Sequence, residues 1–161
     1  MIKINIIYVG GIKSGEKYYH EIIGEYIKRL SVGFKIANIE IKEEKLPENP
    51  NESEIAACLK SEGKKILAKI NPGAYKISLC VEGKKMPSED FAALLYKNGA
   101  NCASVDFIIG SSHGLSDEVK KSSDCLLSLS DMTFAHRLAR VMLMEQIYRA
   151  YAIETGRKYH K

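Results

Sequence analysis

The chain lacks any long apolar run. No stretch approaches the run of about 18 apolar residues that a membrane-spanning helix needs, so no such helix is predicted. The first nine residues, MIKINIIYV, are too short and too rich in β-branched side chains for a secretory signal, and no small-residue cleavage site follows them. We therefore expect a cytoplasmic protein that does not act at a membrane.

Paired cysteines are also missing. The sequence has no C-x-x-C motif and no histidine at zinc-ligand spacing, and its cysteines lie more than twenty residues apart at positions 58, 80, 102 and 125. This pattern predicts buried, reduced thiols and no metal site. A catalytic cysteine is the alternative, and it would need a base and electropositive surroundings that a sequence does not reveal.

What is present is typical of a globular protein. The 161 residues correspond to one domain, residues 1–161, because domains usually span about 100 to 200 residues. Hydrophobic residues make up 45% of the chain and charged residues 27%, which argues against disorder and against a disulfide-dense miniprotein. A folded core is therefore expected.

The apolar pattern alternates between strand and helix along the chain. Runs typical of strands are Ile2–Val9, Phe34–Ile41, Tyr75–Val81, Val105–Ile109 and Cys125–Leu129. Helical spacing and capping signals predict helices at residues 19–30, 51–70, 88–98, 116–121 and 134–154, with Ser88 as the cap of the third. Strands separated by helices need crossover connections, so we predict an α/β fold with a mostly parallel five-stranded sheet flanked by helices.

The last predicted helix is apolar on every side. Its apolar residues point all the way round the axis: Leu138, Val141, Met142, Leu143, Met144, Ile147, Tyr148 and Tyr151. Such a helix must be covered on every side. In a domain of this size one side can meet the sheet and the other a second subunit, so we predict a homodimer. A helix enclosed within one chain is the alternative.

Positive charge is concentrated at the C-terminus. Residues 134–161 hold six Lys and Arg against two Glu, which accounts for the whole net charge of +4. This asymmetry suits an end of the molecule that faces a polyanion such as nucleic acid, although a solvated basic tail has the same composition.

Two predicted loops lie where open α/β sheets bind ligands, beyond the carboxyl ends of strands. The first loop, residues 110–115, reads GSSHGL and fits neither the G-x-G-x-x-G nor the G-x-x-x-x-G-K-[ST] pattern, so the usual dinucleotide and triphosphate sites are not supported. Its glycines, Gly110 and Gly114, would let the backbone approach a flat ligand, and they are equally typical of a tight turn.

The second loop runs from Leu129 to Arg137 and enters the last helix. Helix N-termini carry free N–H groups and a positive potential. His136 and Arg140 lie four residues apart on one face of that helix. The pair could contact an anionic substrate, or it could be a structural histidine beside a surface arginine.

Four segments together carry a family resemblance. They are FIIGSSHGLS at 107–116, LSLSDMTFAH at 127–136, Arg140 with EQIYRA at 145–150, and the terminal YHK at 159–161. In these segments the chain resembles the RlmH family, the ribosomal large-subunit pseudouridine methyltransferases of the SPOUT (α/β-knot) class. The family usually has a second glycine at the position of Ser111 and often a proline at that of Ala135. Neither difference removes a functional group.

The resemblance implies a C-terminal trefoil knot that binds S-adenosylmethionine in a bent pose, with subunits that pair through the knot and the last helix. Transferred residue by residue, the cofactor contacts would be Leu79, Gly110, Leu129, Ser130, Asp131, Met132, Thr133 and Phe134. Apolar side chains would sandwich the adenine while main-chain groups meet its edge. A phosphate-binding loop is then unnecessary.

The implied reaction is methyl transfer to N3 of a pseudouridine in a 23S rRNA stem-loop, helix 69, in the 70S ribosome or the large subunit. Because the sulfonium already activates the methyl group, the protein must align the reactants and allow loss of the imide proton, with no metal. The candidate catalytic residues are Arg140, Tyr159 and His160, with His160 as the proton acceptor and Arg140 facing an oxyanion or a phosphate. The candidate RNA contacts are His136, Arg157, Lys158 and Lys161.

Two other interpretations compete with this one. The first is a catalytically silent module of the same fold that binds RNA or the ribosome, and the second is a flavodoxin-like nucleotide binder. Binding of S-adenosylmethionine separates the enzyme from the silent module, because a ligand that binds only the folded state stabilises it. A flavin binder would purify yellow.

Overall fold

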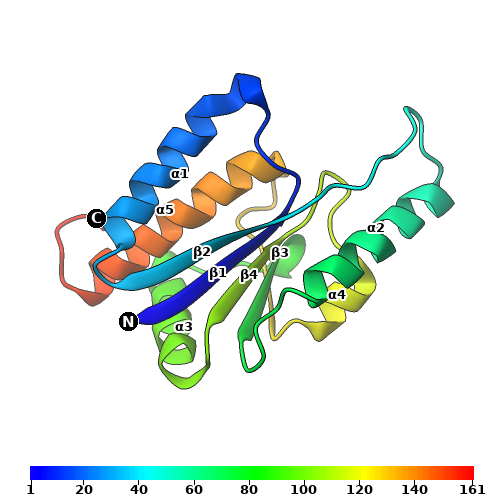
Figure 1. Ribbon diagram of the computed structural model, residues 1–161. Coiled ribbons are helices and arrows are strands. Elements are labelled where there is room, and N and C mark those ends of the chain that lie inside the picture. Colours follow the sequence, from blue (N-terminus) through cyan, green and yellow to red (C-terminus); the bar gives the residue numbers. More distant parts are fainter.

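The computed structural model describes all of residues 1–161 and contains one five-stranded sheet (Figure 1). Its strands, in the spatial order β2-β1-β4-β3-β5, are all parallel to their neighbours. They are β1 (Ile2–Val9), β2 (Phe34–Ile41), β3 (Tyr75–Lys84), β4 (Val105–Ile109) and β5 (Cys125–Leu127). The predicted α/β fold with a five-stranded sheet is confirmed.

Helices lie in the connections between the strands, and the last helix follows β5. They are the 3-10 turn η1 (Ser14–Glu16), α1 (Lys17–Leu30), α2 (Glu52–Leu67), α3 (Ser88–Asn101), α4 (Asp117–Ser122) and α5 (His136–Glu154). Side chains cap two of these helices: those of Asn51 and Ser116 accept hydrogen bonds from the backbone N–H groups of Glu54 and Val119. None of the helices has both the length and the apolar character to cross a membrane.

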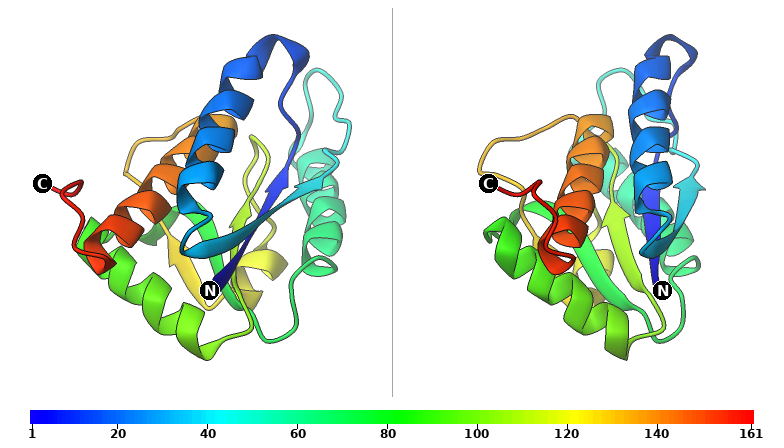
Figure 2. Two further views of the ribbon diagram at one scale, coloured as in Figure 1. Left: turned by 60° about the vertical axis from the view of Figure 1, so that its left-hand side comes forward. Right: turned by 90° about the vertical axis from the view of Figure 1, so that its left-hand side faces the viewer.

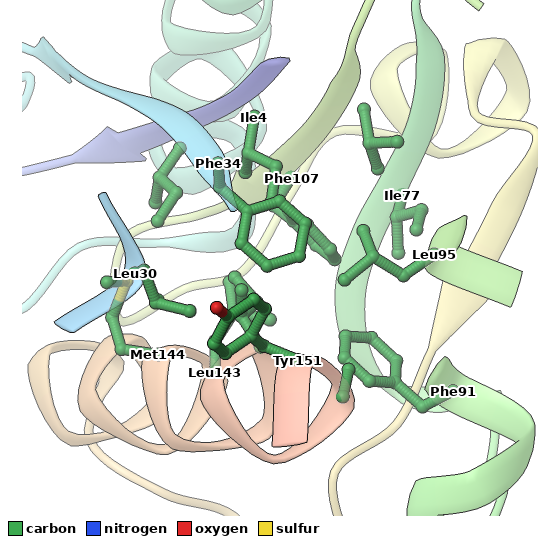
Figure 3. Packing of buried hydrophobic residues seen from close by; sticks show 14 of the residues in the cluster. Ile4, Leu30, Phe34, Ile77, Phe91, Leu95, Phe107, Leu143, Met144 and Tyr151 are labelled. Carbon is green, nitrogen blue, oxygen red and sulfur yellow. The ribbon is translucent and has the colours of Figure 1, made fainter. Parts of the chain in front are cut away.

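Helices cover both faces of the sheet (Figures 1 and 2). On one face α1, α3 and α5 enclose the larger core, in which Leu95, Phe107 and Leu143 are fully buried (Figure 3). On the other face α2 and α4 enclose a smaller core. Successive side chains of a strand point to opposite faces, so the neighbours Ile6 and Ile7 of β1 belong to different cores.

The outer side of α5 is left apolar within one chain. Leu143, Met144 and Ile147 are fully buried, whereas Val141 and Met142 are half-buried and Leu138 is 40% exposed. The helix is therefore not enclosed within its own chain, which was the alternative to a homodimer. The homodimer itself stays a prediction.

Two local predictions were wrong. Pro87 occupies the cap position of α3, and the hydroxyl of Ser88 donates a hydrogen bond to Gln146 Oε1 on α5 at 2.8 Å instead of capping its own helix. All four cysteines are free, but only Cys58 is buried and the other three are half-buried. Ser88 therefore joins α3 to α5. The predicted burial of the thiols holds for Cys58 alone.

The end of β3 passes close to β5. The strand was predicted to end at Val81, but it continues to Lys84, whose carbonyl accepts a hydrogen bond of 3.0 Å from the N–H of Ser128. A Cβ atom on Gly83 would lie 2.7 Å from the backbone of Leu126 and Leu127, so only glycine fits there. This approach brings the last residues of β3 against the loop that follows β5.

Candidate functional site

A cavity of about 710 Å³ lies beyond the carboxyl ends of β3, β4 and β5. Its walls come from residues 79–82, the turn 109–115, the segment 127–136 without Asp131, and Lys120 and Ala139 on two helices. Ligand sites usually measure about 300 to 1,000 Å³. The cavity therefore has the size of a small-molecule site, at the sheet edge where the sequence predicted one.

Seven of the eight residues proposed to contact the cofactor line this cavity: Leu79, Gly110, Leu129, Ser130, Met132, Thr133 and Phe134. The eighth, Asp131, does not. Its side chain is 82% exposed and forms an ion pair of 2.5 Å with Lys85. The fold thus brings Leu79, Gly110 and the loop 129–134 to one cavity, although they are distant in the sequence. Asp131 belongs to that loop, but it does not line the cavity.

The glycines of the 110–114 turn serve the turn itself. A Cβ atom on Gly110 would clash with the carbonyl oxygen of Gly114, and Gly114 has a φ of +85°, which favours glycine. The N–H of Gly114 donates to the Ser111 carbonyl at 2.9 Å and closes the turn. Of the two explanations for these glycines, the tight turn is the one that the geometry supports.

A buried carboxylate that sequence reasoning missed holds the same turn. Glu62 on α2 is 2% exposed; its Oε1 accepts a hydrogen bond from Ser111 Oγ at 3.1 Å and its Oε2 accepts one from the N–H of Glu44 at 3.1 Å. Glu62 therefore ties the cavity wall to α2 and to the segment after β2. In the sequence it looks like any acidic residue of an amphipathic helix, so no signal marked it.

The loop after β5 is held by its own serines. Ser128 Oγ donates to the carbonyl of Ser130 at 2.9 Å, and the N–H of Met132 donates to Ser130 Oγ at 3.1 Å. Met132 and Thr133 are exposed, while Phe134 is half-buried. The loop thus combines a fixed backbone with apolar side chains that remain available to a ligand.

The charged side chains of the cavity are paired with each other. Lys120 Nζ lies 2.5 Å from Glu82 Oε1. This hydrogen bond raises the pKa of Lys120 and lowers the pKa of Glu82, so both groups are ionised at neutral pH. Because the lysine is already paired, the site offers no free cation of the kind that cradles phosphates. It suits a ligand such as adenine, which needs apolar contact and main-chain hydrogen bonds.

His136, the first residue of α5, lies on the cavity wall. Burial lowers the pKa of the imidazole below its ordinary value of 6.5, and the positive charge of Arg137 acts in the same direction. The imidazole is therefore neutral at pH 7. Its Nε2 atom is buried and has no hydrogen-bond partner within the chain.

Arg140 does not line the cavity. It is 6% exposed, its guanidinium carbon lies 3.6 Å from the centre of the Tyr8 ring, and its Nη2 donates to Asn38 Oδ1 at 2.8 Å. Within one chain Arg140 therefore does not reach the cavity, and its contact with a target base or phosphate stays a prediction. Helical periodicity placed it beside His136, but it turns toward β1 and β2.

The two terminal candidates lie at the far end of α5. Tyr159 donates from its hydroxyl to Glu145 Oε2 at 2.8 Å, and His160 Nε2 lies 2.8 Å from Glu89 Oε1 on α3. Glu145 is nine residues along α5 from His136, which corresponds to roughly 14 Å at the rise of an α-helix. Within one chain Tyr159 and His160 do not reach the cavity.

The predicted RNA contacts fall into two places. Arg157, Lys158 and Lys161 are exposed beyond the end of α5, whereas His136 is at its beginning. Arg157 stacks on the ring of Tyr151 at 4.8 Å and donates to its hydroxyl at 3.2 Å. The exposed members of this set, Arg157, Lys158 and Lys161, therefore lie in the C-terminal segment that holds the net positive charge.

Comparison with known proteins gives full-length matches. The family model described as "Predicted SPOUT methyltransferase" matches residues 2–160. The "Ribosomal RNA large subunit methyltransferase H" of Streptococcus thermophilus is 47% identical over 161 residues, covering 99% of this chain and 100% of the relative. Proteins with the same name from an Exiguobacterium species and from Carboxydothermus hydrogenoformans are each 45% identical with the same coverage.

Proposed function

Because the chain belongs to the SPOUT methyltransferase family, we propose that it transfers a methyl group from S-adenosylmethionine to ribosomal RNA of the large subunit. The observation that carries the proposal is the cavity at the strand ends, which gathers seven residues of the inferred cofactor site in a chain matched over its whole length. Membership of the class also implies the C-terminal trefoil knot.

The cavity is suited to the cofactor in three respects. Leu79, Leu129 and Met132 offer apolar surface to an adenine ring. The fixed loop after β5 presents main-chain groups to its edge. The pairing of Lys120 with Glu82 leaves no phosphate-binding cation, and S-adenosylmethionine has no phosphate. These features support this cofactor over the phosphate-bearing flavin of a flavodoxin-like protein.

The finer proposal is methyl transfer to N3 of a pseudouridine in the helix 69 stem-loop of 23S rRNA, in the 70S ribosome or the large subunit. Bound S-adenosylmethionine supplies a methyl group on a sulfonium, so a new N3–C bond replaces the S–C bond and the N3 proton leaves. His160 accepts this proton, and Tyr159 lies beside the target base. The basic residues Arg157, Lys158 and Lys161 bind phosphates. A ribosomal substrate places the protein in the cytoplasm.

A homodimer would account for the distance between the C-terminal tail, residues 159–161, and the cavity of the same chain. Tyr159 and His160 lie away from the cavity of their own chain, and the outer side of α5 is apolar and partly uncovered. We propose that two subunits pair on this side of α5, so that the tail of one subunit completes the cavity of the other. Cofactor binding and catalysis then depend on different parts of the chain.

Truncation tests this division. Deleting residues 159–161 should leave the calorimetric affinity for S-adenosylmethionine nearly unchanged, because no deleted residue lines the cavity. The same variant should lose methyl transfer to ribosomes. The matched control is Lys161→Gln, which keeps Tyr159 and His160 and should lose only part of the affinity for the ribosome. A truncated protein that transfers methyl groups at the full rate would refute the role of the tail.

An intact protein that binds no S-adenosylmethionine would refute the proposed enzyme and favour a silent RNA-binding module.

A further inference from the structure

The first two turns of α5 contain two polar side-chain atoms that have no hydrogen-bond partner within the chain. They are His136 Nε2 and Arg140 Nε, both buried. The two residues are four apart and therefore lie on the same side of the helix. Buried polar atoms are bonded in the great majority of cases, to protein or to ordered water. Two such atoms on the same side of successive helical turns point to a shared ligand.

Both residues line the same small void. It measures about 10 Å³ and lies behind the wall of the large cavity, against Tyr8 and Ile109. A void needs about 10 to 15 Å³ to hold a water molecule. A phosphate, a carboxylate group or a base is too large for this space. The volume therefore restricts the ligand to the size of one water molecule.

We propose that one water molecule is bound in this void and bridges Arg140 to His136. A guanidinium N–H can only donate, so Arg140 Nε donates to the water oxygen. The proposal includes the direction of the second hydrogen bond: the water donates one of its hydrogens to an unprotonated His136 Nε2. One water molecule thus gives both atoms a partner, accepting a hydrogen bond from Arg140 Nε and donating one to His136 Nε2.

The charges around His136 agree with this arrangement. Burial, Arg137 and Lys13 favour the neutral imidazole, while Glu43 and Glu16 oppose them without reversing the shift. A neutral imidazole that accepts at Nε2 carries its proton on Nδ1. The bridge thus assigns one tautomer to His136.

The consequence for the large cavity is a histidine of fixed orientation. His136 lines both the void and the cavity, whereas Arg140 lines only the void. Arg140 is then a positioning residue, which acts on the cavity through the water and His136. This last step rests on the proposed function, because it concerns how the cavity binds its cofactor. The water site and the tautomer do not depend on it.

Two measurements on the unmodified protein test the site without any methylation assay. A crystal structure that resolves ordered waters should contain a water within hydrogen-bond distance of Arg140 Nε and His136 Nε2. Nitrogen-15 NMR of the imidazole at pH 7 should give a protonated Nδ1 and an unprotonated Nε2. An empty void, a chloride ion in it, or a proton on Nε2 would overturn the proposal. An inactive protein with the water and this tautomer would contradict the proposed function and leave this inference standing.

A pair of variants separates the bridge from a purely structural role of Arg140. Arg140→Met removes the donor while keeping a long side chain, and it should remove the water and change the tautomer populations of His136. Arg29→Met is the control, since Arg29 is an exposed residue of α1 paired with Glu25. It should leave the His136 spectrum unchanged. A folded Arg140→Met protein with an unaltered His136 spectrum would also contradict the bridge.

Discussion

Asp106, the second residue of β4, has a carboxyl group with no exposed surface. Its Oδ1 accepts hydrogen bonds from Asn5 Nδ2 at 2.7 Å and from Ser104 Oγ at 2.6 Å, and its Oδ2 accepts one from the N–H of Asn71 at 2.9 Å. A buried charge is tolerated only when it is paired or fully hydrogen-bonded. Here three donors from three segments meet at one side chain, which joins β1 and β4 to the end of the connection before β3.

Replacing Asp106 with Asn should therefore destabilise the fold. The amide turns one acceptor into a donor and leaves it facing other donors, which should cost about 2 to 4 kcal/mol of the free energy of unfolding. Urea denaturation measures this loss. Asp117→Asn, at an exposed position of α4, is the matched control and should change stability by only a few tenths of a kcal/mol. Equal losses in the two variants would contradict the role of Asp106.

His136 should make stability depend on pH just below neutrality. The pKa of His136 in the folded state is lowered from 6.5, so between 6.5 and that lower value the unfolded state binds more protons than the folded one. The contribution of His136 to the free energy of unfolding is therefore complete above pH 6.5, and it is lost as the pH falls from 6.5 through the lowered pKa. His136→Gln should make the free energy of unfolding depend less on pH, from pH 7 down to the pH at which carboxylates begin to titrate. A slope that is the same in both proteins would show that His136 does not titrate in this way.

At the scale of elements, Glu145 joins the C-terminal segment to two helices. Its carboxylate accepts hydrogen bonds from Tyr26 Oη at 2.6 Å, Tyr159 Oη at 2.8 Å and Arg149 Nη2 at 2.6 Å. Burial raises the pKa of this carboxyl, but the three hydrogen bonds outweigh it and hold the pKa below its usual value. The ring of Tyr159 also packs edge-on against Tyr148, with ring centres 4.8 Å apart. A tail that would otherwise fray is thereby attached to α1 and α5.

Glu145→Gln should loosen this attachment. Glutamine keeps the size of the side chain but has one acceptor oxygen in place of two, so at least one of the three donors loses its partner. Carboxypeptidase should then release Lys161 and His160 faster than from the unmodified protein, while the melting temperature changes little. Glu154→Gln, exposed at the end of α5, is the control and should leave the release rate unchanged. Equal release from all three proteins would show that Glu145 does not hold the tail.

The elements were largely predictable because their apolar patterns are local. The spacing of Ile23, Ile27 and Leu30 defines the buried side of α1 without any knowledge of its neighbours. The exceptions depend on contacts with distant segments. β3 extends past Val81 because Lys84 pairs with Leu127 at the end of β5. Ser88 bonds to Gln146, which is 58 residues away in the sequence. Neither partner can be found by reading residues in order.

The candidate site was predictable in place but not in every residue. Strand ends and loops located the cavity, and the family resemblance supplied seven residues of its lining. Helical periodicity assigned Arg140 to the side of the helix that carries His136, but it did not show that the guanidinium lies against Tyr8 and not on the cavity wall. Glu62 was missed because burial of an acidic residue leaves no trace in the sequence.

At the scale of the whole molecule, the outer side of α5 should form the dimer interface. Met142 is half-buried and lines an apolar groove between α3 and α5, together with Val141 and Phe91. Tyr148 is less suitable for a test, because it packs against Tyr26 and Tyr159 of its own chain. Met142→Glu would place a charge in a desolvated interface and should give monomers.

Light scattering at micromolar concentration measures the effect of Met142→Glu. The unmodified chain should have the mass of two subunits, and the variant should have the mass of one while its circular dichroism is unchanged. Ser122→Glu, on the opposite face of the sheet at the end of α4, should remain dimeric. A monomeric unmodified chain would contradict the homodimer and, with it, the completion of the cavity by a partner's tail.

The most direct test of the central claim is to map the transferred methyl group. Ribosomes from a strain that lacks this protein are incubated with the purified chain and isotopically labelled S-adenosylmethionine, and the 23S rRNA is digested and analysed by mass spectrometry. We expect one labelled methyl group for each 23S rRNA molecule, on N3 of a pseudouridine in the helix 69 stem-loop, and none when the cofactor is left out. Ribosomes that acquire no label, or that carry it on another type of nucleotide, would contradict the account.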